Sequence, residues 1–446
     1  MPLLLAALAA ASGSPARPAE DAVVRLPLDP PSPRAPGEIR LLPDEADLRP
    51  GNAAVVLLRM PWEQGGWMRE VYPRLRELSI LDPDDPRLAE VRFDGFASQM
   101  QRAAGMREAD WCYPLEDGDL SAILLPDVQG LRAMIGWGMP VWISQRIAAG
   151  DPAAAREGVA TMIGCSRHVA RTPLFVPQVV ASATGQAALD QVERLIARGG
   201  QPSLRPALAR LPDELGDGRA AARLEGRMLE RSLPSIRSGD CRPGDAAAWT
   251  RVMEEYLRDN DALTGRDGDA ADRATRRRAL ASAARAAIDD GSFDAPEEPA
   301  SDDEIAIRWL LHRNREVFRR AEEGWDLPGP EAIDALAMRD ARHDAIRDGS
   351  PWGSPLQAYL ACHRFGRRAR LLEAVEAIRE TLATDGDRLP ASLADVAGVP
   401  RDPLTGRAFV YVPAADRRSA RLACPPSPVD DDASPSRAYA LSIADR

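Results

Sequence analysis

Apolar residues recur at helical spacing through most of the chain. After Gly150-Asp151-Pro152, which suits a turn, an N-cap and a first helical residue, apolar side chains return every three or four residues as far as Thr172. This segment predicts one long amphipathic helix. The same period predicts further helices at residues 67–78, 88–106, 131–147, 175–196, 219–231, 246–257, 270–288, 304–320, 331–346 and 356–382.

The connections between these helices are short, which favours helical hairpins that stack side by side. The turn at Gly150 is similar to that of a tetratricopeptide hairpin, although the period of about 34 residues does not continue beyond this pair. Near the C-terminus, a proline-flanked strand at 408–412 is expected to pair with 421–424 and 439–443. We therefore predict a mainly α fold, an irregular α-solenoid-like or stacked helical-hairpin array with a small C-terminal β element.

Changes in composition divide the chain into parts. Prolines crowd residues 15–50, and proline, which lacks an N–H group, resists both helix and sheet. Residues 289–303 are acidic and interrupted by proline, which indicates a solvated loop. The expected parts are a signal-like segment at 1–16, a proline-rich linker at 17–50, an N-terminal helical array at 51–288, an acidic loop at 289–303, C-terminal helices at 304–385 and a small α+β cap at 386–446.

The first residues predict export. Leu3 to Ala11 form a short apolar run that ends in three alanines, and small residues suit cleavage by signal peptidase. The run is far shorter than the roughly 20 residues that cross a bilayer, so no transmembrane segment is expected. A frayed apolar tail is the alternative. We predict an extracytoplasmic protein, periplasmic or secreted, and an intact Met1 on protein isolated from the cytosol would contradict this.

The charged residues exclude several classes of function. All 57 basic side chains are arginine, so phosphate-binding loops, Schiff-base chemistry and kinase chemistry lack the lysine that they need. The formal net charge of -11 repels a polyphosphate backbone, and no nucleic-acid partner is expected. The sequence has no cofactor motif, and no cofactor is predicted. An enzyme is therefore the less favoured class.

The five cysteines are widely spaced and odd in number, which argues against a disulfide framework. Cys165 and Cys362 lie in apolar helical patterns, and we interpret them as core residues. One or two bridges in an exported protein are the alternative.

One cluster has the residue types of a glycan-binding site. Trp111 is followed closely by Glu116 and Asp117, and an aromatic face beside carboxylates can stack a sugar and protonate its leaving oxygen. The alternative is a buried tryptophan before a solvated acidic turn. These three residues are the binding candidates of the sequence, and no catalytic residue is predicted.

Two patterns contain parts of metal sites without completing them. Asp340 and His343 share a helix face, but a di-iron site needs matching ligands on facing helices. The aspartates at 259–272 lack the glycine and glutamate positions of a calcium loop. No metal site is predicted. The dense basic patches at 276–278 and 363–370 are interpreted as intramolecular charge pairs or a protein contact, with an anionic polymer as the alternative.

The residues of one C-terminal turn have separate roles. Asp402 can accept N–H bonds of the turn, Pro403 fixes φ, Gly406 permits a positive φ, and Tyr411 lies in the strand that follows. With residues 386–393, the segment resembles a cassette, G-x-x-LPxSL followed by DPxxGxxFxY, of a family of exported, helix-rich bacterial proteins. The stretches at 109–111, 124–126, 167–170 and 201–212 support the resemblance. It implies export and a helical fold, and no activity.

Two hypotheses for function follow. The first is an exported helical scaffold or protein-binding module without catalytic activity, whose partner is a protein or a cell-envelope component. It predicts a continuous concave face between helices. The second is an all-α glycan-active enzyme with Trp111 as platform and Glu116 or Asp117 as acid. It predicts that these side chains converge on one deep pocket.

Overall fold

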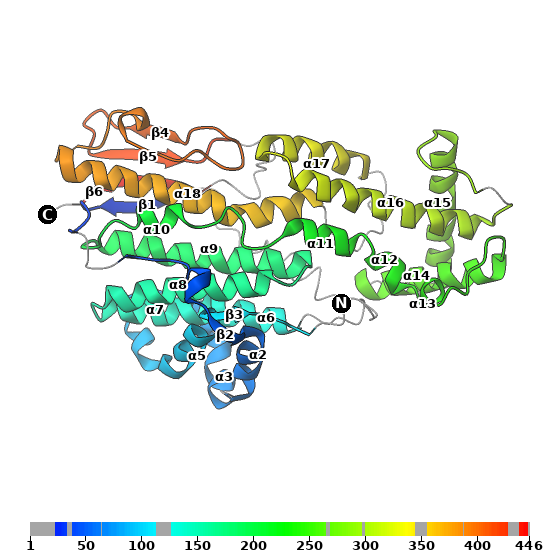
Figure 1. Cartoon of the computed structure of the whole chain (residues 1–446), viewed down its shortest axis with the longest axis horizontal. Helices are drawn as coiled ribbons and strands as arrows, with labels where there is room; N and C mark the ends of the chain where they lie inside the picture. Colours follow the sequence, from blue (N-terminus) through cyan, green and yellow to red (C-terminus); the bar gives the residue numbers. More distant parts are fainter. Residues whose placement is uncertain are drawn as a thin grey trace.

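The computed structural model describes residues 23–33, 38–63, 65–112, 126–264, 268–296, 299–343, 355–386, 388–426 and 437–444. Within these ranges the chain forms an elongated, mainly helical molecule, with a small sheet towards one end and projecting helices at the other (Figure 1). The prediction of a mainly α fold with a small C-terminal β element is confirmed.

Three long helices form the centre of the body, namely α8 (Pro152–Ala170), α9 (Phe175–Arg198) and α18 (Pro355–Asp385). Helix α8 starts where it is predicted, because the Asp151 side chain accepts a hydrogen bond from the backbone N–H of Ala154 at 3.0 Å. Helix α9 packs against both α8 and α18. Its Leu189 and Val192 are completely buried in the main hydrophobic core.

A second, mainly helical layer covers the other side of α8. Its helices and its two short strands are β2 (Arg49–Asn52), α2 (Ala53–Glu63), α3 (Gly65–Val71), α4 (Leu75–Ser79), α5 (Asp94–Ala104), β3 (Met106–Glu108), α6 (Pro126–Ala133) and α7 (Met139–Ala148). Strands β2 and β3 form a small parallel pair. Helices α5 and α7 pack directly on α8, and α2 packs on α5. A π-helical turn at Met134–Gly138 joins α6 to α7.

Two predicted helices of this layer are shorter than expected. The helix predicted at 67–78 is interrupted by a 3-10 turn at Tyr72–Arg74, because Pro73 has no N–H group for the helical ladder. The helix predicted at 88–106 begins only at Asp94, after a 3-10 turn at Pro86–Glu90. The sequence pattern does not predict α2, although Leu57 of this helix is buried in the core.

A four-stranded sheet packs against the body. Its order is β1 (Val23–Leu28), β6 (Ala438–Ile443), β5 (Ser419–Ala423) and β4 (Val410–Pro413). Strands β1 and β6 are parallel, and the other pairs are antiparallel, with Leu422 opposite Tyr439. The interpretation of residues 17–50 as a linker is therefore wrong for residues 23–28. Proline at position 27 is compatible with this strand because β1 lies at an edge of the sheet.

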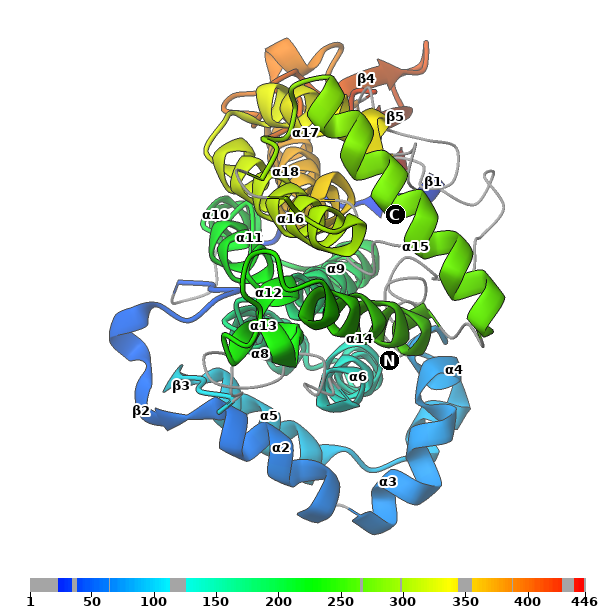
Figure 2. The same ribbon diagram turned by 90° about the vertical axis from the view of Figure 1, so that its right-hand side faces the viewer.

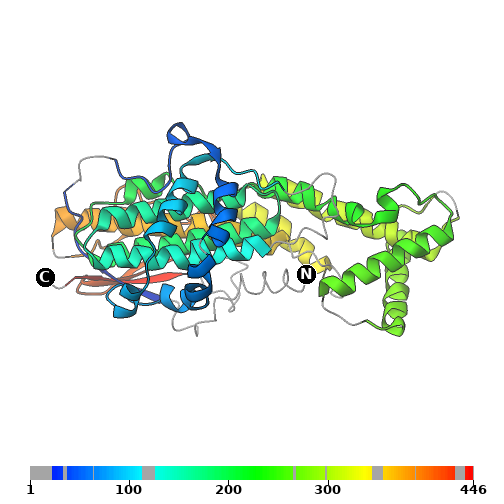
Figure 3. The ribbon, with the colours of Figure 1, turned by 90° about the horizontal axis from the view of Figure 1, so that it is seen from below.

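Most of the remaining helices form an arm, residues 227–311, and the junction of the arm with the body. These helices are α11 (Gly218–Glu225), α12 (Met228–Ser232), α13 (Pro234–Arg237), α14 (Ala246–Thr264), α15 (Ala270–Asp289), α16 (Asp302–Trp325) and α17 (Gly329–His343). Helix α10 (Arg205–Ala209) lies in the body, where it packs on α18. Figure 3 shows α14 and α15 extending beyond the body, while α16 runs back towards it, and in Figure 2 this arm faces the viewer. The single helix predicted at 219–231 is divided into α11 and α12 at Gly226.

The acidic loop at 289–303 connects helices that pack against each other. Ala284 and Ala287 of α15 share a hydrophobic cluster with Ile305 and Trp309 of α16. A further cluster joins α14 to α16. The helices on both sides of the loop therefore belong to one packed unit, a point that the sequence leaves open.

Candidate functional site

A cleft lies where the arm meets the body, between α11, α12 and α13 on one side and α16 on the other. Figure 1 shows where these helices lie. Its volume is about 630 Å³, within the range of roughly 300–1,000 Å³ of ligand sites. We call it the arginine cleft. Its lining residues are Ala222, Arg223, Gly226, Arg227, Glu230, Arg231, Ile236, Arg237, Arg315, Phe318, Arg319 and Glu322.

The base of the cleft depends on a close approach between α11 and α16. Gly226 ends α11, and an added Cβ atom there would lie 2.9 Å from the Cβ of Phe318, so only glycine fits without a shift. The side-chain amide of Asn314 donates a hydrogen bond to the carbonyl oxygen of Gly226 at 3.0 Å. These contacts hold the walls of the arginine cleft together at one end.

Three arginines of the rim carry ion pairs and remain exposed. Arg223 pairs with Glu322, and Arg315 pairs with Glu230. The exposed fractions of the side chains of Arg223, Arg315 and Arg319 are 60%, 57% and 53%. The hydrogen bond to Glu322 raises the pKa of Arg223. Because these pairs are solvated, each contributes little to stability and can exchange one carboxylate for another.

Two further arginines of the cleft have no ion-pair partner in the part of the chain that the structure describes. They are Arg227, between α11 and α12, and Arg237, the last residue of α13, and both are exposed. Six arginines and two glutamates therefore surround one cleft, in a chain whose formal net charge is -11. Such a local reversal of sign attracts an anionic ligand.

The floor of the cleft is apolar. Phe318 is buried and stacks on Phe175 of α9, with ring centroids 6.1 Å apart. Ala222 is completely buried beside it, and Ile236 of α13 is half-buried at the opposite wall. The cleft thus combines an apolar floor with a cationic, solvated rim, an arrangement typical of the core and rim of a protein interface.

Glu225, the last residue of α11, precedes Gly226 and is buried against α9. Its carboxylate accepts a hydrogen bond from the backbone N–H of Phe175, the first residue of α9, at 2.6 Å. Burial raises the pKa of Glu225 to about 7, although the bond from Phe175 acts in the opposite direction. The carboxyl group therefore ionises in the folded protein only near neutral pH.

We expect the stability of the protein to depend on pH through Glu225. Because its pKa is higher in the folded than in the unfolded chain, the folded state loses stability as the pH rises from 4.5 to about 7. Glu225→Gln cannot ionise, so the wild type should lose on the order of 3 kcal/mol relative to this variant between pH 4 and pH 8. Urea unfolding at both pH values measures the difference. Parallel pH profiles for the two proteins would contradict the assignment.

The basic patches noted in the sequence are intramolecular charge pairs. Arg276 pairs with Asp261, and Arg277 pairs with Asp303. On α18, Arg370 contacts Glu373 at 3.0 Å. The interpretation as internal pairs agrees with these contacts, and these arginines are already engaged by carboxylates of the chain.

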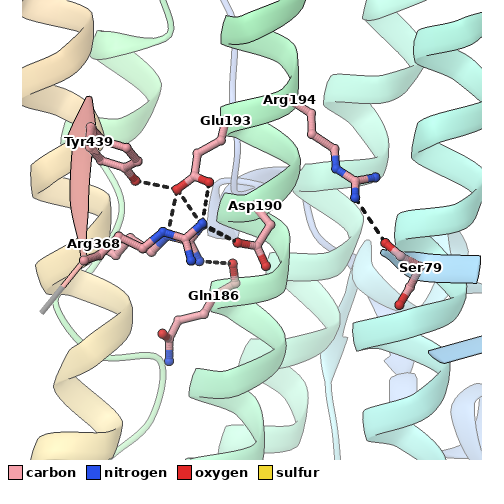
Figure 4. Close-up of polar contacts among 8 residues, drawn as sticks. Ser79, Gln186, Asp190, Glu193, Arg194, Arg368 and Tyr439 are labelled. Atoms are coloured by element: carbon pink, nitrogen blue, oxygen red, sulfur yellow. Dashed lines mark hydrogen bonds and ion pairs between the residues drawn. The ribbon is translucent and has the colours of Figure 1, made fainter. Parts of the chain in front are cut away.

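Arg368 lies at the centre of a buried network (Figure 4). Its guanidinium donates to the Glu193 carboxylate at 2.6 Å and to the carbonyl oxygen of Gln186 at 2.8 Å, and it also pairs with Asp190. Burial alone would lower the pKa of Arg368, but the two carboxylates raise it. The hydroxyl of Tyr439 donates to Glu193. The network therefore ties α18 and β6 to α9.

Trp111, the candidate platform for a sugar, does not present its ring to solvent. Its ring is buried, and its indole N–H donates to the carbonyl oxygen of His168 at 3.0 Å. This position agrees with the alternative interpretation, a buried tryptophan. Glu116 and Asp117 lie outside the described residues, as do residues 1–16 of the predicted export segment.

The turn at Asp402 has the geometry that an Asp-Pro-x-x-Gly sequence requires. The Asp402 carboxylate accepts the N–H of Leu404 at 3.2 Å, and the N–H of Gly406 donates to the Asp402 carbonyl at 2.8 Å. Gly406 has a φ of +66°. The Tyr411 hydroxyl donates to the carbonyl oxygen of Pro390 at 3.0 Å, so the two halves of the cassette contact each other.

Other potentially reactive groups are separated or neutral. His363 and Glu214 approach to 3.8 Å, too far for a hydrogen bond, and burial lowers the pKa of His363 to about 4. All five cysteines are free thiols, and burial raises the pKa of Cys165 to about 12. Within the described ranges, no cluster of three or more His, Cys, Asp or Glu side chains could hold a metal ion.

No helix of the described ranges has both the length and the apolar character to cross a bilayer. Comparison with protein-family models, with curated proteins and with solved structures finds no match to this chain. The resemblance to exported, helix-rich bacterial proteins therefore stays a prediction. The arginine cleft, with six arginines around one opening, is the feature of the described structure that best suggests a function.

The sequence contains a signal for this cleft in the spacing of its arginines. Arg223, Arg227 and Arg231 follow one another at intervals of four residues, and Arg315 and Arg319 repeat the interval. Side chains four residues apart share a helix face. Such rows indicate a cationic face, but the sequence does not show that the two rows line the same cleft.

Proposed function

We propose that the protein is a helical scaffold without catalytic activity that binds an acidic region of a protein partner in the arginine cleft. One observation carries the proposal: six arginines line one cleft of a strongly acidic chain. Opposite charge accelerates encounter and selects the partner, and an apolar floor supplies contact area. A protein exposed on the cell envelope would be a suitable partner if the predicted export occurs.

The second candidate is a glycan-active enzyme. Trp111 does not favour it, because a buried ring has no free face on which a sugar could stack. A nucleic acid is also a poor candidate. Its continuous phosphate charge would be repelled by the acidic remainder of the chain, and Phe318 is too deeply buried to stack on a base. An acidic protein segment needs no aromatic stacking partner, and its charges can be limited to the few that meet the cleft.

Charge reversal in the cleft tests the proposal. Arg227→Glu/Arg237→Glu replaces the two arginines without partners by glutamates, which repel an acidic ligand. We expect the binding of fluorescein-labelled poly-L-glutamate to weaken by about ten-fold or more at low ionic strength. Fluorescence anisotropy with the full chain measures the affinity. Both residues are exposed, so the variant should fold as the wild type does.

The matched control carries the same change of charge elsewhere. Arg25 of β1 and Arg421 of β5 are exposed on the sheet, away from the cleft. Arg25→Glu/Arg421→Glu should bind poly-L-glutamate nearly as the wild type does, because the sheet lies towards the other end of the molecule and salt screens the interaction between distant exposed charges. Equal losses in the cleft variant and in this control would refute the proposal, since binding would then follow net charge alone.

A further inference from the structure

We infer that the ligand of the arginine cleft is an amphipathic acidic peptide segment, with carboxylates bound by Arg227 and Arg237 and apolar side chains seated against Ile236. This inference rests on the proposed function and adds the chemistry of the partner. It follows from the pattern of charge around the cleft and from the composition of its floor.

The cleft already shows how carboxylates bind to its rim. Glu322 reaches Arg223 from α16, and Glu230 of α12 reaches Arg315 on the opposite wall. Each pair places a carboxylate of the chain on an arginine of the cleft. Arg227 and Arg237 stand beside these pairs without a carboxylate in the described chain. A ligand with carboxylates can complete the pattern with charge-assisted hydrogen bonds of the same kind.

The rim glutamates restrict the charge spacing of the ligand. Glu230 and Glu322 stand among the six arginines, so a polymer with a charge on every unit would place some of its charges against them. Like charges at such short range weaken the binding of such a polymer, poly-L-glutamate included, without abolishing it. A peptide in which uncharged residues separate the glutamates or aspartates avoids this repulsion.

The floor requires apolar groups on the ligand. Ile236 is only half-buried in the free protein and presents carbon atoms beneath the arginines, next to the buried Ala222 and Phe318. A leucine or phenylalanine of the ligand would cover this surface and exclude water, a contribution that is favourable in proportion to the buried apolar area. More than half of the side-chain surface of Arg223, Arg315 and Arg319 stays exposed, as expected for the rim of a protein contact.

Two designed peptides separate this inference from the proposed function. The first is a labelled helical peptide with glutamates on one face and leucines on the other. The second has the same glutamates with every leucine replaced by glutamine. We expect the first peptide to bind the full wild-type chain about ten-fold more tightly, because burying one leucine side chain has an effect of at least this size. This comparison needs no variant of the protein.

Variants of the protein then show which residues supply the apolar contribution to binding and which supply the charge contribution. Ile236→Asn should abolish most of the difference between the peptides, whereas Arg227→Glu/Arg237→Glu should weaken both of them. Inorganic polyphosphate and vesicles that contain phosphatidylglycerol serve as competitors. Circular dichroism and urea unfolding establish that each variant is folded.

The outcomes are distinct. Preference for the leucine peptide, lost in Ile236→Asn, supports the inference. Equal affinity for the two peptides, or stronger binding of polyphosphate or of the vesicles, overturns it while the cleft remains a binding site for anions. Absence of binding of every probe, including poly-L-glutamate, refutes the proposed function together with the inference.

Discussion

Replacement of Arg379 by methionine should lower the free energy of unfolding by about 3–5 kcal/mol, because it breaks a completely buried ion pair. Arg379 and Glu376 of α18 are both 0% exposed and approach to 2.6 Å. The guanidinium also donates to the carbonyl oxygens of Asp29 at 3.0 Å and of Gln201 at 3.3 Å. The variant leaves Glu376 buried without its cation. Urea unfolding monitored by circular dichroism measures the loss.

The pH dependence of this loss identifies its cause. Burial raises the pKa of Glu376, while Arg379 lowers it, so removing Arg379 removes the lowering effect. A carboxyl group with a raised pKa destabilises the folded state as the pH increases. The loss in Arg379→Met should therefore be larger at pH 8 than at pH 5, and a loss independent of pH would contradict the explanation by an unpaired carboxylate.

A control uses an ion pair at the surface. Arg285 pairs with Asp302, and about 60% of each of these side chains is exposed (59% and 60%). Arg285→Met should leave the unfolding midpoint close to that of the wild type, because exposed ion pairs contribute little. A similar effect of Arg285→Met and Arg379→Met would show that burial of the ion pair does not determine how much stability is lost.

Substitution of Gly366 by alanine should destabilise the protein by roughly 3 kcal/mol, although alanine is the better helix former. Gly366 lies in the middle of α18, and an added Cβ atom would overlap the backbone carbonyl and Cα of Asp213. Backbone atoms cannot rotate away as a side chain can. The chain around Asp213 would have to separate from α18, with loss of packing on both sides.

Gly130 provides the matched control, because it lies in α6 and an added Cβ atom would meet no atom within 4 Å. Gly130→Ala should stabilise the protein by about 0.5–1 kcal/mol through helix propensity. The two identical substitutions are thus expected to have opposite signs in the same thermal or urea unfolding experiment. Stabilisation by both would show that α18 and the Asp213 segment are not in the contact described.

The helices could be predicted from the sequence because their signals are local. The Asp151 cap, the proline after it and the apolar period predict α8, and the structure places the helix at Pro152–Ala170. Interruptions are less visible. Pro73 and Gly226 each divide a segment whose apolar period continues, because period alone does not detect a missing N–H group or a close approach of helices.

The parts that could not be predicted depend on contacts between distant residues. Strand β1 pairs with β6, more than 400 positions later in the chain, and residues 23–28 alone show only a proline in a short apolar run. The arginine cleft also depends on contacts between residues that are distant in the sequence. Arg223, Arg227 and Arg231 form one row, but Arg315 and Arg319 join them only through the packing of α11 on α16.

The most direct test of the account is hydrogen–deuterium exchange of the full chain with and without the helical glutamate–leucine peptide. If the peptide binds in the arginine cleft, exchange should slow at residues 222–237 and 315–322, which supply both walls of the cleft. Exchange in the sheet and in α2 should not change. Protection confined to the sheet or to α2, with the cleft unaffected, would contradict the claim that this cleft is the binding site.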